Sequence, residues 1–110
     1  MDKQLRKGLL EYCVLAVIEK EDSYGYKMIE DISPYIEISE STLYPILRRL
    51  EEAGRVRSYN TEHNNRIRKY FHITKEGREI LKEFGKVREE LMIVLDFIVG
   101  GRRDDEGNIS

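Results

Sequence analysis

Apolar residues recur at helical spacing in the first 34 residues. Between residues 5 and 18 they cover more than one side of a predicted helix, which is typical of a helix buried nearly all round. In so small a chain, we expect part of that surface to meet another subunit. Asp22 or Ser23 can cap a second helix, which ends before Pro34 because the residue preceding a proline disfavours helical geometry. Residues 35–38 are predicted to form a short extended link.

Residues 39–53 are predicted to form a third, amphipathic helix. Leu43, Ile46, Leu47 and Leu50 stand at i, i+3, i+4 and i+7, which places them on one face. The opposite face and its edges carry Ser41, Thr42, Tyr44, Pro45, Arg48, Arg49 and Glu52. Ser39 or Ser41 can act as the N-cap, and Gly54 suits the C-terminal stop. An ordinary helix with a solvated outer face has the same pattern, so the segments that follow decide its role.

Two strands are predicted after Gly54, over residues 56–61 and 69–73, where β-forming residues alternate with polar ones. Asn64 and Asn65 lie between them and tolerate the positive φ that a tight hairpin turn requires. Two helices joined by a short link form a helix-turn-helix, and three helices followed by a hairpin form a winged helix. The predicted fold is therefore mainly α with a small β-hairpin.

A last helix is predicted from Thr74, its cap, to about Val99, with Gly100 and Gly101 as the stop. Its apolar residues follow the 3.5-residue repeat of a coiled coil: Ile80, Phe84, Val87, Leu91, Val94 and Ile98. We predict that this helix dimerises, the alternative being that it folds back onto its own domain. The predicted dimer interface comprises these residues together with Leu9, Leu10, Val14 and Leu95.

The chain is thus divided into a winged-helix domain (residues 1–74), a C-terminal dimerisation helix (75–100) and a disordered tail (101–110). Its net charge of −2 alone argues against nucleic-acid binding. Residues 54–70, however, hold five basic side chains against Glu62, whereas residues 21–38 hold five acidic ones against Lys27. Because charges are screened over roughly 8–10 Å in ordinary salt, local sign decides where phosphate is attracted. The hairpin is therefore predicted to contact phosphate, the alternative being a solvated ribbon.

Enzymatic chemistry finds little support in the sequence. His63 and His72 are isolated, without a second ligand at metal spacing, and there is no phosphate-binding glycine loop or nucleophile elbow. We predict no catalytic site, no metal and no cofactor. The single Cys13 cannot form an internal disulfide and is expected to be buried and reduced. No apolar run approaches the roughly 20 residues of a membrane span, and no secretion signal is evident, so a cytoplasmic protein is expected.

Three motifs resemble the PadR family of bacterial transcriptional regulators. They are Tyr24-Gly25-Tyr26, Ser39-x-x-Thr42-Leu43-Tyr44-Pro45 with its continuation to Gly54, and Arg68-Lys69-Tyr70-Phe71-x-Ile73-Thr74-x-x-Gly77. The resemblance covers about residues 5–98, and the short last helix is similar to the small-subunit branch of the family. It implies a winged-helix DNA-binding domain, a C-terminal dimerisation helix and repression of a nearby promoter. The family's wing is commonly glycine-rich, whereas this one carries His63-Asn64-Asn65.

The resemblance also implies which residues touch DNA, with the third helix in the major groove and the wing on the flanking backbone or minor groove. Arginine bonds guanine in bidentate fashion, so Arg48 is the first candidate for a base contact and Arg49 the second. Ser41, Thr42 and Tyr44 are expected on phosphates, with Pro45 shaping the helix. The remaining phosphate contacts implied are Tyr24, Tyr26, Lys27, Arg66, Arg68 and Lys69. Two-fold symmetry predicts an inverted-repeat operator, with recognition helices roughly 34 Å apart on double-stranded DNA.

Some members of the branch bind flat aromatic drugs between dimer helices using tryptophan, which this chain lacks. Leu10, Val14, Met92 and Leu95 permit a pocket for a small apolar or aromatic effector at the dimer seam, or they simply pack together. The function predicted is a homodimeric repressor released by such a ligand. The alternative is a winged helix that docks onto an acidic protein partner without reading DNA sequence.

Overall fold

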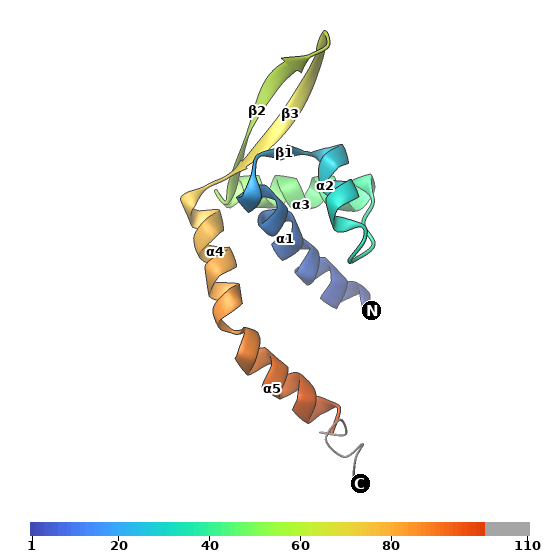
Figure 1. Cartoon of the computed structure of the whole chain (residues 1–110), viewed down its shortest axis with the longest axis vertical. Coiled ribbons are helices and arrows are strands. Elements are labelled where there is room, and N and C mark those ends of the chain that lie inside the picture. Colours follow the sequence, from blue (N-terminus) through green and yellow to red (C-terminus); the bar gives the residue numbers. More distant parts are fainter. Residues whose placement is uncertain (101–110) are drawn as a thin grey trace.

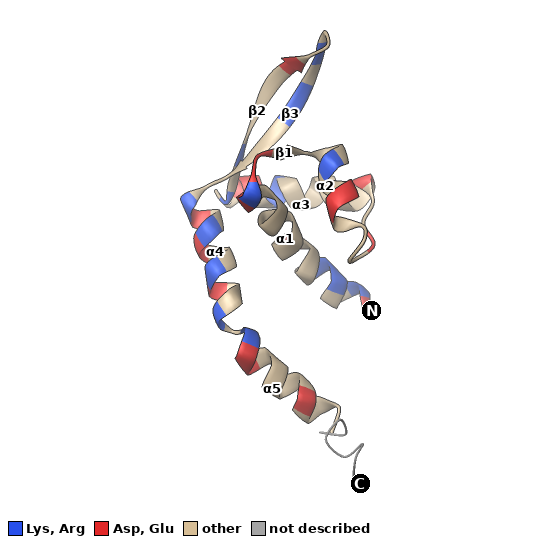
Figure 2. Cartoon of the chain, in the orientation of Figure 1, with Lys and Arg blue, Asp and Glu red and all other residues tan. Residues whose placement is uncertain are grey.

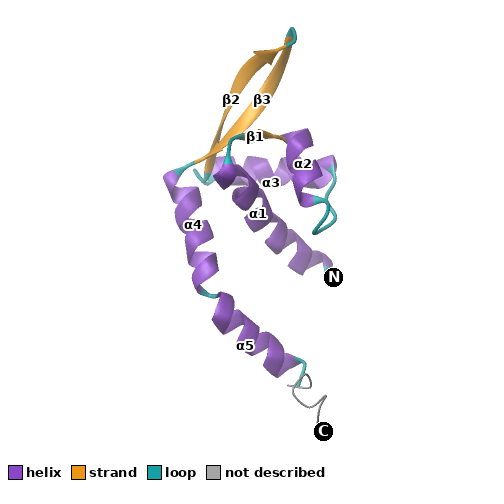
Figure 3. Ribbon diagram, viewed as in Figure 1, coloured by secondary structure: helices purple, strands orange, loops and turns teal. Residues whose placement is uncertain are grey.

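The computed structural model describes residues 1–100, which form five helices and one three-stranded antiparallel sheet (Figures 1 and 3). In chain order these are α1 (Lys3–Lys20), β1 (Ser23–Tyr24), α2 (Gly25–Ile32), α3 (Glu40–Glu52), β2 (Val56–His63), β3 (Arg66–Ile73), α4 (Lys75–Lys86) and α5 (Arg88–Ile98). The predicted winged helix is confirmed. The tail for which disorder was predicted, residues 101–110, lies outside the described residues.

The core lies where α1, α2 and α3 meet the inner face of the sheet. All four residues of the apolar face predicted for α3 are buried to 2% exposure or less. The other helices contribute Leu10, Val14, Leu15, Ile18, Met28 and Ile32, and the sheet contributes Val56, Phe71 and Ile73. The helical spacing of apolar residues therefore correctly predicted which side of α3 faces inward, and by exclusion which side faces solvent.

The hairpin of β2 and β3 forms the wing, which projects beyond the helices (Figure 1). Its turn is the predicted one, since Asn64 and Asn65 have φ of 52° and 64°. The strands pair from Val56↔Ile73 to His63↔Arg66 and are longer than predicted, because the alternation weakens beyond the core. The third strand, β1, pairs its two residues with β3 and was not predicted, since two residues carry no pattern.

The junction between the wing and α4 explains the motif Thr74-x-x-Gly77. The Thr74 hydroxyl donates to the Gly54 carbonyl oxygen at 2.7 Å and accepts from the Gly77 amide at 3.1 Å, which makes Thr74 the predicted cap. A Cβ at Gly77 would collide with the carbonyl oxygen of Arg55. Gly54 itself has φ of 76°, the left-handed geometry that ends α3.

The single helix predicted for residues 74–99 is wrong, because the chain breaks at Val87 (φ −91°, ψ 2°) into α4 and α5. α4 packs back on its own domain: the ring of Phe84 stacks on Tyr12 with centroids 4.1 Å apart, and Ile80 packs against the core. α5 has no buried residue and extends away from the body (Figure 1). The coiled-coil repeat is therefore divided between an intramolecular half and an exposed half.

Two further predictions need correction. Leu10 and Val14 are 1% and 0% exposed in the single chain, so they have no surface left for a partner and are wrong as interface residues. The second helix begins at Gly25 with Tyr24 at its N-cap position, without a side-chain cap, instead of being capped by Asp22 or Ser23. Ser23 belongs to β1, and extended backbone there delays the start of α2.

Candidate nucleic-acid interface

The outer face of α3 carries Ser41, Tyr44, Pro45 and Arg48, all exposed as predicted. At its start the hydroxyl of Ser39 lies 3.1 Å from the Ser41 hydroxyl and 3.2 Å from that of Thr42. These short polar side chains lie at the exposed start of the helix, where backbone N–H groups have no intrahelical partner. This end of α3 therefore offers hydrogen-bond donors to an anion.

The two arginines of α3 have different environments. The Arg49 guanidinium pairs with Glu11 on α1, with Nη2 2.9 Å from Oε2, and is therefore turned away from the outer face. For Arg48, no hydrogen bond, ion pair or ring contact is found within residues 1–100. Its five donors remain available, which suits a bidentate contact to a base. The structure therefore favours Arg48, the first candidate for a base contact, over Arg49, the second candidate.

The Tyr24-Gly25-Tyr26 motif brings the start of α2 against α3. A Cβ at Gly25 would collide with the hydroxyl end of Tyr44, so glycine allows this tyrosine to lie directly against the start of α2. A hollow of about 480 Å³ lies between the starts of α2 and α3 and strand β3, lined by Tyr26, Tyr44 and Lys69 among others. Aromatic and cationic side chains from all three predicted DNA-contact regions therefore meet at one place.

The basic residues of the wing divide between its two faces. Phe71 and Ile73 face the core, so alternation along β3 places Lys69 on that face and Arg66 and Arg68 on the other. The Arg68 guanidinium lies 4.1 Å above the ring centre of Tyr24, a cation–π contact that holds it beside α2. Arg66 is exposed near the tip. A flat contact of one wing face with DNA would not engage all three cations.

Lys27, in the first turn of α2, forms an ion pair with Asp31 at 3.1 Å. The hydrogen bond and the charge of Asp31 raise the pKa of Lys27, which keeps it protonated. An exposed pair of this kind contributes little to stability, so the ammonium can exchange its partner for a phosphate at small cost.

A polar cluster anchors the base of the wing to the loop before β1. The Asp22 carboxylate accepts a hydrogen bond from the Tyr59 hydroxyl at 2.5 Å and contacts Nδ1 of His72 at 2.8 Å. Partial burial would raise the pKa of Asp22, but these two hydrogen bonds and the charges of His72 and Arg57 outweigh it and lower the pKa. The cluster therefore ties both long strands, β2 through Tyr59 and β3 through His72, to the loop before β1.

Comparison with known proteins identifies the family to which this surface belongs. The sequence model of the transcriptional regulator PadR-like family matches residues 14–83. The chain belongs to the PadR-like family of transcriptional regulators. The resemblance inferred from the three motifs is therefore confirmed.

Solved structures agree with this assignment. A protein from Streptococcus mutans UA159 is 45% identical, with a TM-score of 0.75 over 86% of this chain and 89% of that one. A PadR family transcriptional regulator from Eggerthella lenta DSM 2243 is 32% identical, with a TM-score of 0.78 over 88% and 87%. Bacillus subtilis PadR, crystallised with operator DNA, is 21% identical, with a TM-score of 0.65 over 69% and 46%, and shows the shared fold alone.

Our sequence analysis missed one basic surface of this PadR-like chain, at the start of α1. Lys3, Arg6 and Lys7 line a hollow of about 570 Å³ together with Ser41 and Arg49. The spacing i, i+3, i+4 places the three α1 cations on one side of the helix and could have revealed them. The sequence cannot reveal that this side lies next to α3.

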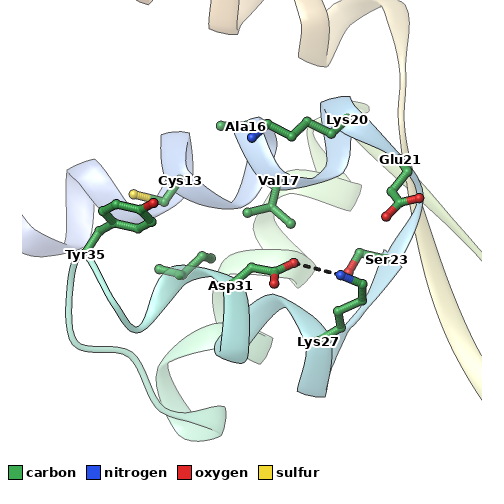
Figure 4. A pocket seen from close by; sticks show the side chains of 10 residues that line it. Cys13, Ala16, Val17, Lys20, Glu21, Ser23, Lys27, Asp31 and Tyr35 are labelled. Carbon is green, nitrogen blue, oxygen red and sulfur yellow. Dashed lines mark hydrogen bonds and ion pairs between the residues drawn. The ribbon is translucent and has the colours of Figure 1, made fainter.

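A separate cavity of about 530 Å³ lies between α1 and α2 (Figure 4). Cys13, Ser23, Lys27 and Asp31 are among the side chains that line it. The Ser23 hydroxyl is buried without a hydrogen-bond partner among the described residues. Cys13, which was predicted to be buried, is half-buried, and this burial raises the pKa of its thiol, which disfavours the reactive thiolate.

The effector pocket predicted from Leu10, Val14, Met92 and Leu95 is not assembled within one chain, since the first two lie in the core and the others on α5. Residues 1–100 contain no group of three His, Cys, Asp or Glu side chains placed to hold a metal ion. The same residues include no helix that is both long and apolar enough to span a membrane.

Proposed function

We propose that this PadR-like regulator is a homodimeric repressor that binds an inverted-repeat operator in the cytoplasm. The observation that carries the proposal is the unpaired guanidinium of Arg48 on the outer face of α3, beside the hollow that joins α2 and the wing. A structural neighbour, Bacillus subtilis PadR, was crystallised with operator DNA, which supports the same ligand for this fold.

In this proposal α3 enters the major groove and Arg48 bonds a guanine through O6 and N7. Tyr24, Tyr26, Tyr44 and the hydroxyls of Ser41 and Thr42 approach phosphates. The remaining phosphate contacts are made by Lys27, Arg66, Arg68 and Lys69. Phosphate contacts position the protein on the duplex, and Arg48 supplies the discrimination between sequences.

The dimer is proposed to form through α5. Its apolar side chains, together with Val87 and Val99 at its two ends, are between 39% and 81% exposed, a continuous surface that a monomer would leave in water. Fully burying each such side chain contributes very roughly 1.5–3 kcal/mol. The proposed contacts are Leu91, Val94, Leu95 and Ile98. A two-fold axis between paired helices presents two copies of α3 to successive turns of DNA.

An effector is proposed to act at the seam of this dimer, where Met92 and Leu95 of α5 offer apolar surface. With Leu10 and Val14 buried in the core, α5 must supply most of the lining. A small apolar or aromatic molecule bound there would release DNA by favouring a dimer geometry whose recognition helices no longer match the operator.

Selection of bound sequences from a random DNA pool tests the proposal directly, and an inverted repeat is the expected result. On the selected duplex, log affinity should fall against log salt with a slope of about −0.9 per phosphate contact. Arg48→Ala should lose roughly 1–3 kcal/mol of preference over a scrambled duplex for each half-site. Arg78→Ala, an exposed arginine on α4, is the matched control and should behave as wild type.

The net charge of −2 favours a second candidate function, a module whose basic wing docks onto an acidic protein. Selection without any enriched sequence, together with DNA affinity that is weak and independent of salt, would support docking over repression.

A further inference from the structure

The hollow at the start of α1 is a cationic surface. Lys3, Arg6, Lys7 and Arg49 are among its lining residues, and no carboxylate is. The hydroxyls of Ser41 and Thr42 line it as well, which adds hydrogen-bond donors at the start of α3. A hollow of this chemistry suits phosphate, whose oxygens accept from both kinds of donor.

Acidic side chains nearby engage two of these cations but leave two unpaired. Arg49 pairs with Glu11, and Arg6 lies 4.0 Å from Glu37. Asp2 caps α1 by accepting from the amides of Gln4 and Leu5 at 3.0 and 3.1 Å. For the ammonium groups of Lys3 and Lys7, the part of the chain that the structure describes offers no hydrogen bond or ion pair.

The position of this hollow matters as much as its charge. Around α3, Tyr44 borders the hollow beside α2 and the wing, whereas Thr42 and Arg49 border the hollow beside α1. Ser41 borders the hollow beside α1 as well, and Arg48 lies between the two edges on the outer face. Figure 2 shows basic residues on β3, above α3 in this view, and at the start of α1, below it. Cationic surfaces thus flank the recognition helix on both sides.

The two flanks match the shape of the major groove, a channel about 12 Å wide bounded by one phosphate backbone on each side. We propose that Lys3 and Lys7, together with the hydroxyls of Ser41 and Thr42, bind backbone phosphates of the strand opposite to the one held by α2 and the wing. This inference rests on the proposed function, since it requires α3 to lie in the groove. It adds a second line of phosphate contacts that straddles Arg48.

The test replaces both lysines at once, as Lys3→Gln with Lys7→Gln, because glutamine keeps the helix but removes the charge. The control is Lys20→Gln with Lys82→Gln, which removes the same charge from exposed sites away from this hollow. Because each protomer of the dimer contributes both lysines, the test variant should lower the magnitude of the salt slope by about 3.6, the equivalent of four contacts, and the control by far less. Affinities for operator and scrambled duplex should both weaken by at least about tenfold, because phosphate contacts are indifferent to sequence.

Phosphate ethylation interference on the operator locates the contacts. The wild type should show interference on both backbones bordering each half-site, and the test variant should lose one of these sets. A test variant that keeps the wild-type slope and both sets would overturn the inference while the proposed function stands. If the wild type shows neither sequence preference nor salt dependence, the proposed function fails and this inference with it.

Discussion

The substitution Leu91→Asp tests whether α5 is a dimerisation helix or only an arm that projects into solvent. Leu91 is 40% exposed in the single chain, and α5 contributes no buried residue, so the substitution leaves the winged-helix core intact. In a symmetric dimer the change occurs twice. Dimerisation can bury at most the exposed 40% of each leucine, so losing that burial twice costs about 1.2–2.4 kcal/mol, before any penalty for burying a carboxylate. At about 1.4 kcal/mol per factor of ten, the dissociation constant should rise by roughly 10–50-fold from the lost burial, and further from the carboxylate.

Sedimentation equilibrium over a range of protein concentrations measures this change. The wild type and the control variant Glu89→Gln should sediment as dimers where Leu91→Asp sediments as a monomer. Operator affinity should fall in parallel, because two half-sites are no longer bound by linked domains. A Leu91→Asp protein that remains dimeric with wild-type affinity would refute the assignment of α5 to the interface.

Two further predictions concern the frame that holds the DNA-binding surface. Gly25→Ala should destabilise the domain by about 1 kcal/mol in denaturant unfolding, the low end of overpacking costs, because the new methyl displaces the hydroxyl end of the half-exposed Tyr44 side chain. Gly25→Ala with Tyr44→Ala should recover part of the loss, and unchanged stability of the single variant would contradict the close approach. Folding lowers the pKa of the Asp22 carboxyl from its usual 3.8, so the ionised carboxylate stabilises the folded state. This stabilisation is fully present above pH 3.8 and is lost as the pH falls through the lower pKa of the folded state. Asp22→Asn should therefore flatten the dependence of unfolding free energy on pH in the acid range relative to wild type, and an unchanged profile would show that the contacts with Tyr59 and His72 do not form in solution.

Patterns that act over a few residues were read correctly from the sequence. The spacing of leucines and isoleucine in α3 fixed its buried side, and the paired asparagines gave the turn of the wing. The threonine cap of α4 was likewise confirmed, since its hydrogen bond reaches only three residues along the chain. These features depend on backbone geometry and local burial, which recur wherever the same pattern occurs.

Predictions that depended on distant partners were less accurate. Arg48 and Arg49 are neighbours in sequence, yet only Arg49 meets Glu11, which is 38 residues away along the chain. The apolar repeat of the last helix continues across Val87, but stacking of Phe84 on Tyr12 folds its first half inward. No spacing rule distinguishes an apolar residue that packs on its own domain from one left for a partner.

The sequence by itself determined the winged-helix class, the outer face of α3 and the basic hairpin, because each follows from periodicity and local charge. Only the tertiary structure decided that the start of α1 adjoins α3, that the wing divides its cations between two faces, and that α5 has no buried residue. Those outcomes depend on how helices pack across the core, where contacts between residues far apart in the chain set the arrangement.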